Sequence, residues 1–245
     1  MTPYELLGLV ALIGIARIVL SIRPIAAASN GRSASIAREY LDPFIFAGIA
    51  AWLLITFVAR TYFIPSGSML PTLQINDVLL VDKFEYRFRP PHEGEIAVFP
   101  PPVPTPDDFI KRVIGLPGER FRITKGVVYI NDQPLHEPYV AEQPNYDLEI
   151  RNYGIWENDG YGWHPVDPLQ ANIPPKSAWT SPNTIPPNCY FMMGDNRNNS
   201  EDSHIWGFAQ YGGTFATGQR AGEHAGFTGR AFVIFWPFGQ AKVLN

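Results

Sequence analysis

The sequence predicts a mainly β, antiparallel domain that follows two N-terminal membrane-spanning helices. Three observations support this. The 245 residues include 24 prolines and 21 glycines, which favours short strands and turns over long helices. Short apolar runs bounded by turn residues recur beyond residue 77, and two longer apolar stretches precede residue 61. A hydrophobic content of 46% is ample for a core and excludes a disordered chain.

The first apolar stretch, counted from Pro3 to Ile22, has close to the roughly 20 residues that cross a hydrocarbon core. Its basic residues come after the apolar run, whereas a cleaved signal peptide has them before it, so we predict an uncleaved span within 1–22. The second span is predicted at 44–60, where the apolar run ends at Arg60. Two buried helices of a soluble protein are the alternative, but such helices would have a polar face.

The segment between the two stretches, 23–43, contains or adjoins four arginines, which are Arg17, Arg23, Arg32 and Arg38. Because basic residues are biased toward the cytoplasm, this segment is predicted to be cytoplasmic. The N-terminus and the domain at 61–245 then lie outside. We therefore expect a multi-pass protein of the inner (plasma) membrane whose domain is extracytoplasmic.

The net charge of −4 and the absence of a dense lysine or arginine run argue against a nucleic-acid partner. Cys189 is the only cysteine, which excludes an intrachain disulfide and a multi-cysteine metal site, and we expect it to be buried. The five histidines lie in polar or Pro/Gly-rich surroundings, and no two have the helical spacing of a zinc site. No metal is predicted.

Strands are predicted at 78–81, 95–99, 109–114, 121–123, 127–130, 189–193 and 231–236, with a hairpin turn at Lys125-Gly126. Two regions resist assignment. Residues 136–187 are rich in Pro, Asn, Asp, Tyr and Trp without a sustained period, and we interpret them as a long excursion or a small subdomain. The glycine-rich segment 209–229 is predicted to be a mobile loop rather than a domain.

Residues 64–73 (IPSGSMLPTL) follow the second apolar stretch directly. A serine hydroxyl becomes a nucleophile only when a base removes its proton, and it needs a rigid turn to hold it. Pro65 and Pro71 fix their own φ angles, and Gly67 permits geometry that other residues resist. An ordinary surface loop is the alternative. Ser68 comes eight positions after Arg60, so it lies within about 29 Å of the membrane surface.

Lys111 is a candidate base, because strand alternation puts it on the same face as Phe109 and Val113. Burial against apolar side chains disfavours the ammonium form and lowers a lysine pKa from about 10.4, so a buried lysine can accept a serine proton. The alternative is a solvated lysine whose stem covers apolar residues.

Residues 193–204 form a dense polar segment directly after the predicted strand at 189–193. Asp195 and Arg197 can pair as carboxylate and guanidinium, and the Asn and Ser side chains can fix a turn. A solvated loop is the alternative. A calcium loop is disfavoured because the glycine and the terminal glutamate of the twelve-residue pattern are missing.

Together and in this order, three motifs resemble the bacterial type I signal peptidases, also called leader peptidases. The motifs are SGSMLPT at 66–72, KRVIGLPG at 111–118 and GDNRNNSEDS at 194–203. The resemblance covers roughly 44–135 and 188–238 and implies a signal-peptidase/LexA-like β fold. It also implies that Ser68 is the nucleophile and Lys111 the general base of a Ser-Lys dyad.

The resemblance implies roles for the surrounding residues as well. The Ser66 hydroxyl would join the Ser68 backbone N–H in an oxyanion hole, and Ser200 would orient the lysine amine. Supporting residues would be Asp195, Arg197 and Asp202, the first two as an ion pair. Shallow pockets for small substrate residues would be lined by Ile64, Met69, Leu73 and Ile110.

The implied substrates are preproteins bearing signal peptides, bound as an added strand at the lipid bilayer and cut after Ala-x-Ala-like sites, without a metal or organic cofactor. The chain departs from the family pattern at Asn198, where Asp is usual, at His204, where Arg is common, and at Glu119, where Asp is usual. The open alternatives are a maturation peptidase specialised for one secreted pilin or conjugation factor, and a non-catalytic anchored domain that binds exported chains.

Overall fold

The computed structural model describes residues 3–19, 31–53, 59–167, 169–215, 217–223 and 225–244. The chain divides into two compact units, Met1–Arg60 and Thr61–Asn245. The assignments of these units to membrane, cytoplasm and exterior remain predictions.

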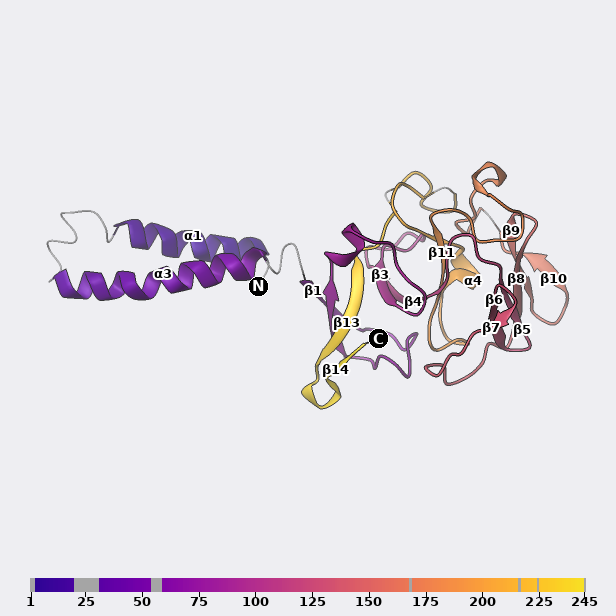
Figure 1. Cartoon of the computed structure of the whole chain (residues 1–245), viewed down its shortest axis with the longest axis horizontal. Coiled ribbons are helices and arrows are strands. Elements are labelled where there is room, and N and C mark those ends of the chain that lie inside the picture. The colour runs from indigo at the N-terminus through magenta and orange to yellow at the C-terminus, as the bar shows by residue number, and fades with distance from the viewer. Residues whose placement is uncertain are drawn as a thin grey trace. The chain divides into compact units, whose positions relative to one another are not determined.

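The first unit consists of helices α1 (Pro3–Val19) and α3 (Gly31–Leu53), which pack against each other (Figure 1). Their contact is close because Gly48 has no side chain: a Cβ there would lie 2.5 Å from Cγ2 of Val10. Helix α3 begins inside the segment for which the sequence predicts a loop, because its first turns contain helix formers such as Ala, Arg and Glu. Within the described residues, neither helix combines the length and apolar character needed to cross a membrane.

The second unit contains two sheets. The first has the strand order β1-β2-β13-β3-β4-β11-β12, with β14 paired to β13. Strand β13 pairs antiparallel with β2 and β3, and β4 pairs antiparallel with β3 and β11. The strands are β1 (Ala59–Phe63), β2 (Val78–Asp82), β3 (Ile96–Phe99), β4 (Phe109–Gly115), β11 (Cys189–Met193), β12 (Ala209–Gln210), β13 (Gly229–Trp236) and β14 (Lys242–Val243).

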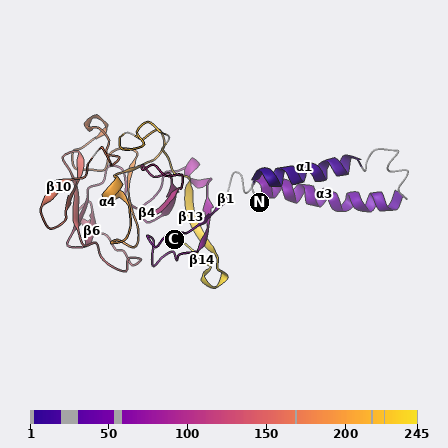
Figure 2. The same cartoon turned by 180° about the vertical axis from the view of Figure 1, so that it is seen from behind.

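The second sheet has the order β10-β9-β8-β5-β6-β7, with every neighbouring pair antiparallel. It lies at the end of the unit away from β13 and β14, as both views show (Figures 1 and 2). Burial alternates along β5, β6 and β8, which places one face of the sheet in the core. The strands are β5 (Phe121–Thr124), β6 (Val127–Ile130), β7 (Gln133–Pro134), β8 (Asp147–Arg151), β9 (Gly154–Asn158) and β10 (Trp163–Pro165).

Every strand that the sequence predicts is present, and the β5–β6 turn has positive φ at both Lys125 and Gly126, as a tight hairpin requires. Strands β8, β9 and β10 lie in the region 136–187 that the sequence leaves unassigned. Short helical turns complete the unit: α4 (Ser203–Trp206) and the 3₁₀ turns Glu85–Arg87, Lys176–Ala178 and Phe238–Gln240.

Three apolar clusters form the core. One joins the two sheets, where the rings of Phe121 and Phe191 stack at 4.1 Å. It includes Cys189, which is fully buried as predicted, and burial raises the pKa of this thiol to about 12. A second cluster surrounds β2 and β13, and a third surrounds Phe99 and Trp206.

The glycine-rich segment 209–229 is packed against the domain in its described part. Phe215 is buried, and the Thr217 hydroxyl donates to the carbonyl of Ile173. Asn172 adds a second attachment: its side-chain amide donates to the Phe208 carbonyl at 2.7 Å, and its side-chain oxygen accepts the Thr217 N–H at 3.2 Å. The segment is therefore held against residues 172–173, and Asn172 in turn binds Phe208 just after α4.

Candidate active site

The loop between β1 and β2, residues 64–77, carries the predicted nucleophile. Its two ends are tied together by hydrogen bonds from the Ile64 N–H to the Asp77 carbonyl and from the Asn76 N–H to the Ile64 carbonyl, both 2.9 Å. The Ser66 and Ser68 hydroxyl oxygens are 3.5 Å apart, with Ser66 exposed and Ser68 half-buried. The two serines of the predicted oxyanion site therefore lie side by side at the surface.

Apolar side chains hold this loop on the first sheet. The residues predicted to line substrate pockets share one cluster, in which Ile64, Met69 and Leu73 are buried and Ile110 is partly exposed. The structure thus brings the four predicted pocket residues together, and it uses three of them as core beneath the nucleophile loop.

Lys111 lies in β4 and is 4% exposed. Its ammonium is 5.7 Å from the centroid of the Phe109 ring, so the two side chains share a face as strand alternation predicts. In the part of the chain that the structure describes, Lys111 forms no ion pair. Burial lowers the pKa of Lys111, opposed by the more distant charges of Asp202, Glu201 and Asp195, and the net pKa is below the ordinary lysine value.

The polar segment after β11 lies directly against the nucleophile loop. A Cβ at Gly194 would be 2.4 Å from the Ser68 carbonyl oxygen and 2.2 Å from Ser200 Oγ, so only glycine fits between them. Asn196 binds the loop through two hydrogen bonds, from its N–H to the Ser68 carbonyl (3.1 Å) and from its amide to the Gly67 carbonyl (3.0 Å). Sequence reasoning missed Asn196, although its place in the polar run was a signal.

Ser200 is buried, and its hydroxyl makes no hydrogen bond among the described residues. Buried hydroxyls are normally bonded, so an unbonded one beside the nucleophile loop is a feature expected of functional sites. Its proximity to Gly194 and to the Ser68 backbone is consistent with the predicted role, which remains a prediction.

The predicted ion pair between Asp195 and Arg197 is wrong. Asp195 instead accepts two hydrogen bonds from Arg112, from Nε to Oδ1 (2.8 Å) and from Nη2 to Oδ2 (2.7 Å). The reason is register: Arg112 is opposite Met193 in the β4–β11 pair, so its side chain reaches the carboxylate just beyond the strand end. The Thr72 hydroxyl also donates to this carboxylate, at 2.5 Å.

Arg197 pairs instead with Glu137, whose side chain is almost fully buried. Glu137 belongs to residues 136–146, here called the covering segment, which joins β7 to β8. The same segment places the Tyr139 ring 3.9 Å from the Arg112 guanidinium. It therefore contacts the polar segment and β4 at once, a connection that sequence reasoning missed.

Asn198, one departure from the family pattern, also binds the covering segment. Its side-chain oxygen accepts the Asn145 N–H and its amide donates to the Gln143 carbonyl, both at 3.0 Å. An aspartate could accept the first bond but could not donate the second. The departure therefore suits a backbone partner that the sequence does not reveal.

Asp202 is fully buried at the start of α4. Its Oδ2 accepts the Gly194 N–H at 3.0 Å, and its Oδ1 lies 2.7 Å from His204 Nδ1. Burial alone would raise the pKa of Asp202, but its bonds to His204 and Gly194 outweigh burial and the pKa is below the usual value. Burial alone would lower the pKa of His204, but the Asp202 carboxylate outweighs burial and the pKa is raised.

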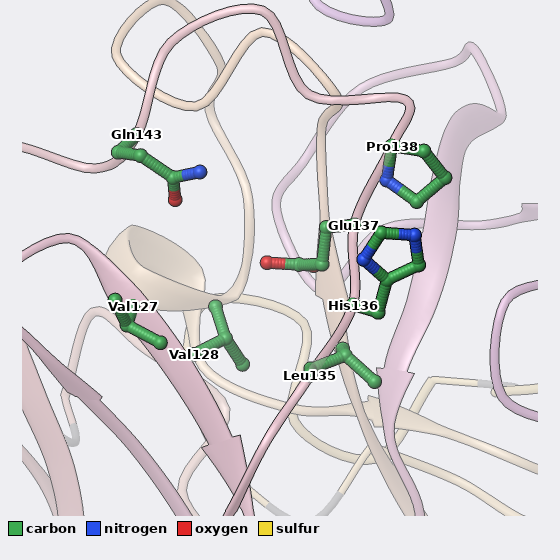
Figure 3. A pocket seen from close by; sticks show the side chains of 7 residues that line it. All are labelled: Val127, Val128, Leu135, His136, Glu137, Pro138 and Gln143. Atoms are coloured by element: carbon green, nitrogen blue, oxygen red, sulfur yellow. The ribbon is translucent and has the colours of Figure 1, made fainter.

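A cavity of about 270 Å³ lies between β6 and the covering segment (Figure 3). The side chains of Glu137 and Gln143 point toward the space between them, over Val127 and Val128. Its lining includes neither Ser68 nor Lys111. Among the described residues, no group of three or more His, Cys, Asp or Glu side chains is arranged to hold a metal ion.

Comparisons with known proteins identify the family to which the chain is similar. The family model described as "Signal peptidase, peptidase S26" matches residues 37–222. A probable signal peptidase I-2 of Synechocystis sp. is 39% identical over 195 residues, which cover 78% of this chain and 69% of that protein. A signal peptidase I of Leptolyngbya laminosa is 36% identical over 226 residues, 89% of each chain.

Among the solved structures that are similar is a signal peptidase I from Enterococcus faecalis V583. It is 30% identical and covers 50% of this chain and 91% of that one, with a TM-score of 0.33. The mainly β, antiparallel class stands on the strand pairings of this chain itself.

Proposed function

This chain belongs to the signal peptidase family, peptidase S26, and is a serine endopeptidase that removes signal peptides from preproteins; we propose that Ser68 and Lys111 are its catalytic pair. The observation that supports this pair best is the state of Lys111. It is a buried lysine without an ion pair among the described residues, and its pKa is lowered by burial. A lysine in this state can be neutral and can accept a proton.

In the proposed reaction, the neutral Lys111 amine takes the proton of the Ser68 hydroxyl while the Ser68 oxygen attacks the scissile carbonyl carbon. The carbonyl oxygen becomes an oxyanion, which accepts hydrogen bonds from the Ser68 N–H and the Ser66 hydroxyl. Lys111 then gives its proton to the leaving amine, and the C–N bond breaks. A water molecule, deprotonated by the same lysine, hydrolyses the acyl-enzyme and regenerates Ser68.

The surrounding contacts support a pre-organised site. Asn196 fixes the carbonyls of Gly67 and Ser68, which restricts the orientation of the peptide groups around the nucleophile. The unbonded hydroxyl of Ser200 has capacity to accept a hydrogen bond from the Lys111 ammonium, which would orient that side chain.

We also propose that the enzyme is anchored by its N-terminal residues, with the catalytic domain on the extracytoplasmic side. The family is membrane-associated. The apolar stretches within 1–22 and 44–60, and the arginines between them, support two spans with this orientation. A preprotein held by its own apolar segment would then present an Ala-x-Ala-like site near Ser68, with its small side chains toward Ile110, the partly exposed member of the four predicted pocket residues.

The test is cleavage of a preprotein whose signal ends in Ala-x-Ala, by the full-length protein in detergent, with mass spectrometry of the products. We expect Ser68→Ala and Lys111→Ala to lose at least about 10³-fold in kcat, as loss of a nucleophile or base does elsewhere. Ser177→Ala and Lys176→Ala, matched changes at exposed residues, should cleave like the wild type. Cleavage by Lys111→Ala within tenfold of the wild type would rule out Lys111 as the base.

A further inference from the structure

We infer that His204, as an imidazolium, is the counterion of the Asp202 carboxylate and thereby prevents this carboxylate from holding Lys111 in its protonated form. The inference rests on the proposed function, because it gives His204 a positioning role for the general base. It concerns one of the three residues at which this chain departs from the family pattern.

The first support is geometric. Asp202 is fully buried, and both its oxygens have identified partners: Oδ1 lies 2.7 Å from His204 Nδ1, and Oδ2 accepts the Gly194 N–H. A buried carboxylate needs a charged partner, since leaving it uncompensated is costly. In the described part of the chain, His204 is the only residue that forms an ion pair with Asp202.

The second support is the electrostatic influence of Asp202 on Lys111. Among the carboxylates that favour the charged form of Lys111, Asp202 has the strongest influence, ahead of Glu201 and Asp195. Asp195 is already neutralised by Arg112. The charge state of Lys111 therefore depends on whether Asp202 is also neutralised.

The groups around His204 favour its charged form. Its ring stacks on Tyr146 of the covering segment, with centroids 4.7 Å apart and an interplanar angle of 20°. Burial raises the pKa of Tyr146 well above its usual range, so this ring is uncharged. Asp202 and Glu157 of β9 both favour the imidazolium, and Lys111 of β4 opposes it. Beyond Tyr146, Arg197 and Glu137 neutralise each other.

These contacts make His204 and Lys111 competitors for one carboxylate. When His204 is charged, Asp202 is compensated and burial acts on Lys111 with less opposition, so the amine is more readily neutral. When the residue at 204 carries no charge, Asp202 attracts the Lys111 proton. An opposite charge within about 4 to 6 Å shifts a pKa by about 1 to 3 units, and a more distant one shifts it by less.

The test compares the pH dependence of kcat/KM for the full-length wild type, His204→Gln and His204→Arg on the Ala-x-Ala preprotein. We expect the acid limb of His204→Gln to move about one pH unit upward, with roughly tenfold lower activity below it and recovery on the alkaline side. His204→Arg, a permanent cation, should restore the wild-type midpoint. The matched control is His164→Gln at an exposed histidine, which should change nothing.

A uniform loss of activity in His204→Gln with an unchanged midpoint would overturn the inference, because a purely structural role lowers the plateau alone. If His204→Gln does not fold, ¹⁵N NMR of the histidine rings in full-length Ser68→Ala decides. We expect His204 to remain an imidazolium above pH 6.5, and a neutral ring at pH 6 would overturn the inference. Failure of the proposed function would be seen separately, as cleavage by Ser68→Ala or Lys111→Ala.

Discussion

Two neighbouring cationic residues on opposite faces of strand β4 differ in their polar partners. Lys111 and Arg112 are equally buried, at 4% and 3% exposed, and alternate across the strand. Arg112 makes two hydrogen bonds to Asp195, donates a third to the Gly94 carbonyl at 2.6 Å, and lies on the Tyr139 ring. Lys111 forms no ion pair among the described residues, and its contact is the Phe109 ring.

The difference follows from the chemistry of the two side chains. A guanidinium does not lose its proton in a protein, so burying Arg112 requires a carboxylate and further acceptors. A lysine amine can become neutral on burial, and withholding a partner is what makes it a base. The domain thus places an ion pair at the arginine, whose charge persists, and none at the lysine that we propose as the general base.

The largest effect on stability is expected from removing the carboxylate partner of Arg112. Asp195→Ala would leave a buried guanidinium without its carboxylate and remove the acceptor of Thr72, so we expect the free energy of unfolding to fall by about 3 to 5 kcal/mol. Urea unfolding followed by tryptophan fluorescence measures this. Asp132→Ala, which breaks an exposed pair with Arg120, should cost less than about 1 kcal/mol. Equal losses in both variants would refute the comparison.

An intermediate effect is expected from replacing Lys111, because this residue should make the wild type more stable as the pH rises. Because the folded-state pKa of Lys111 is below its unfolded value of about 10.4, wild-type stability should rise with pH from the folded-state pKa up to the unfolded one. Lys111→Met should abolish this rise. At pH 9 the free energies of unfolding of the two proteins should differ by less than about 1.5 kcal/mol. As the pH falls, Lys111→Met should become more stable relative to the wild type.

The measurement is thermal or urea unfolding of both proteins between pH 6 and pH 10. A Met variant that is less stable than the wild type at pH 6 would show that Lys111 has a stabilising partner, contrary to the comparison.

The smallest effect is expected at the Tyr139 ring. Tyr139→Leu removes the aromatic face over Arg112 and should cost about 0.5 to 2 kcal/mol of stability, whereas Tyr139→Phe keeps the face and should cost less. Unfolding of the two variants under identical conditions separates them. If Phe is as destabilising as Leu, the hydroxyl bond to Glu137 carries the effect instead of the ring.

What the sequence predicted well depends on local pattern. The apolar runs of β2, β3, β4, β5, β6, β11 and β13 are bounded by turn residues, so each strand could be found from its own residues. The shared face of Phe109 and Lys111 follows from alternation alone. The class of protease followed from three motifs. The contacts of Gly194 and Asn196 bring the first and third motifs together, and Arg112 of the second motif bonds to Asp195 of the third.

What was missed depends on pairing between distant segments. Asp195 and Arg197 are near in sequence, but the β4–β11 register gives Asp195 to Arg112, and no local pattern encodes that register. Strand β10 has only three residues, all exposed, and its composition resembles that of a loop. Strand β8, in contrast, alternates polar and apolar residues, a local signal that sequence reasoning overlooked. The partners of Glu137 and Asn198 were hidden for the same reason.

The close approach at Gly194 has a consequence for exchanging parts between relatives. The carbonyl of Ser68 on one side and the hydroxyl of Ser200 on the other are separated by a residue without a side chain. Neither loop can shift without colliding with the other or losing its contacts to it. The two loops must therefore match each other in shape. A chimaeric enzyme should therefore receive 64–77 and 194–204 from the same parent, together with the covering segment that holds the second of them.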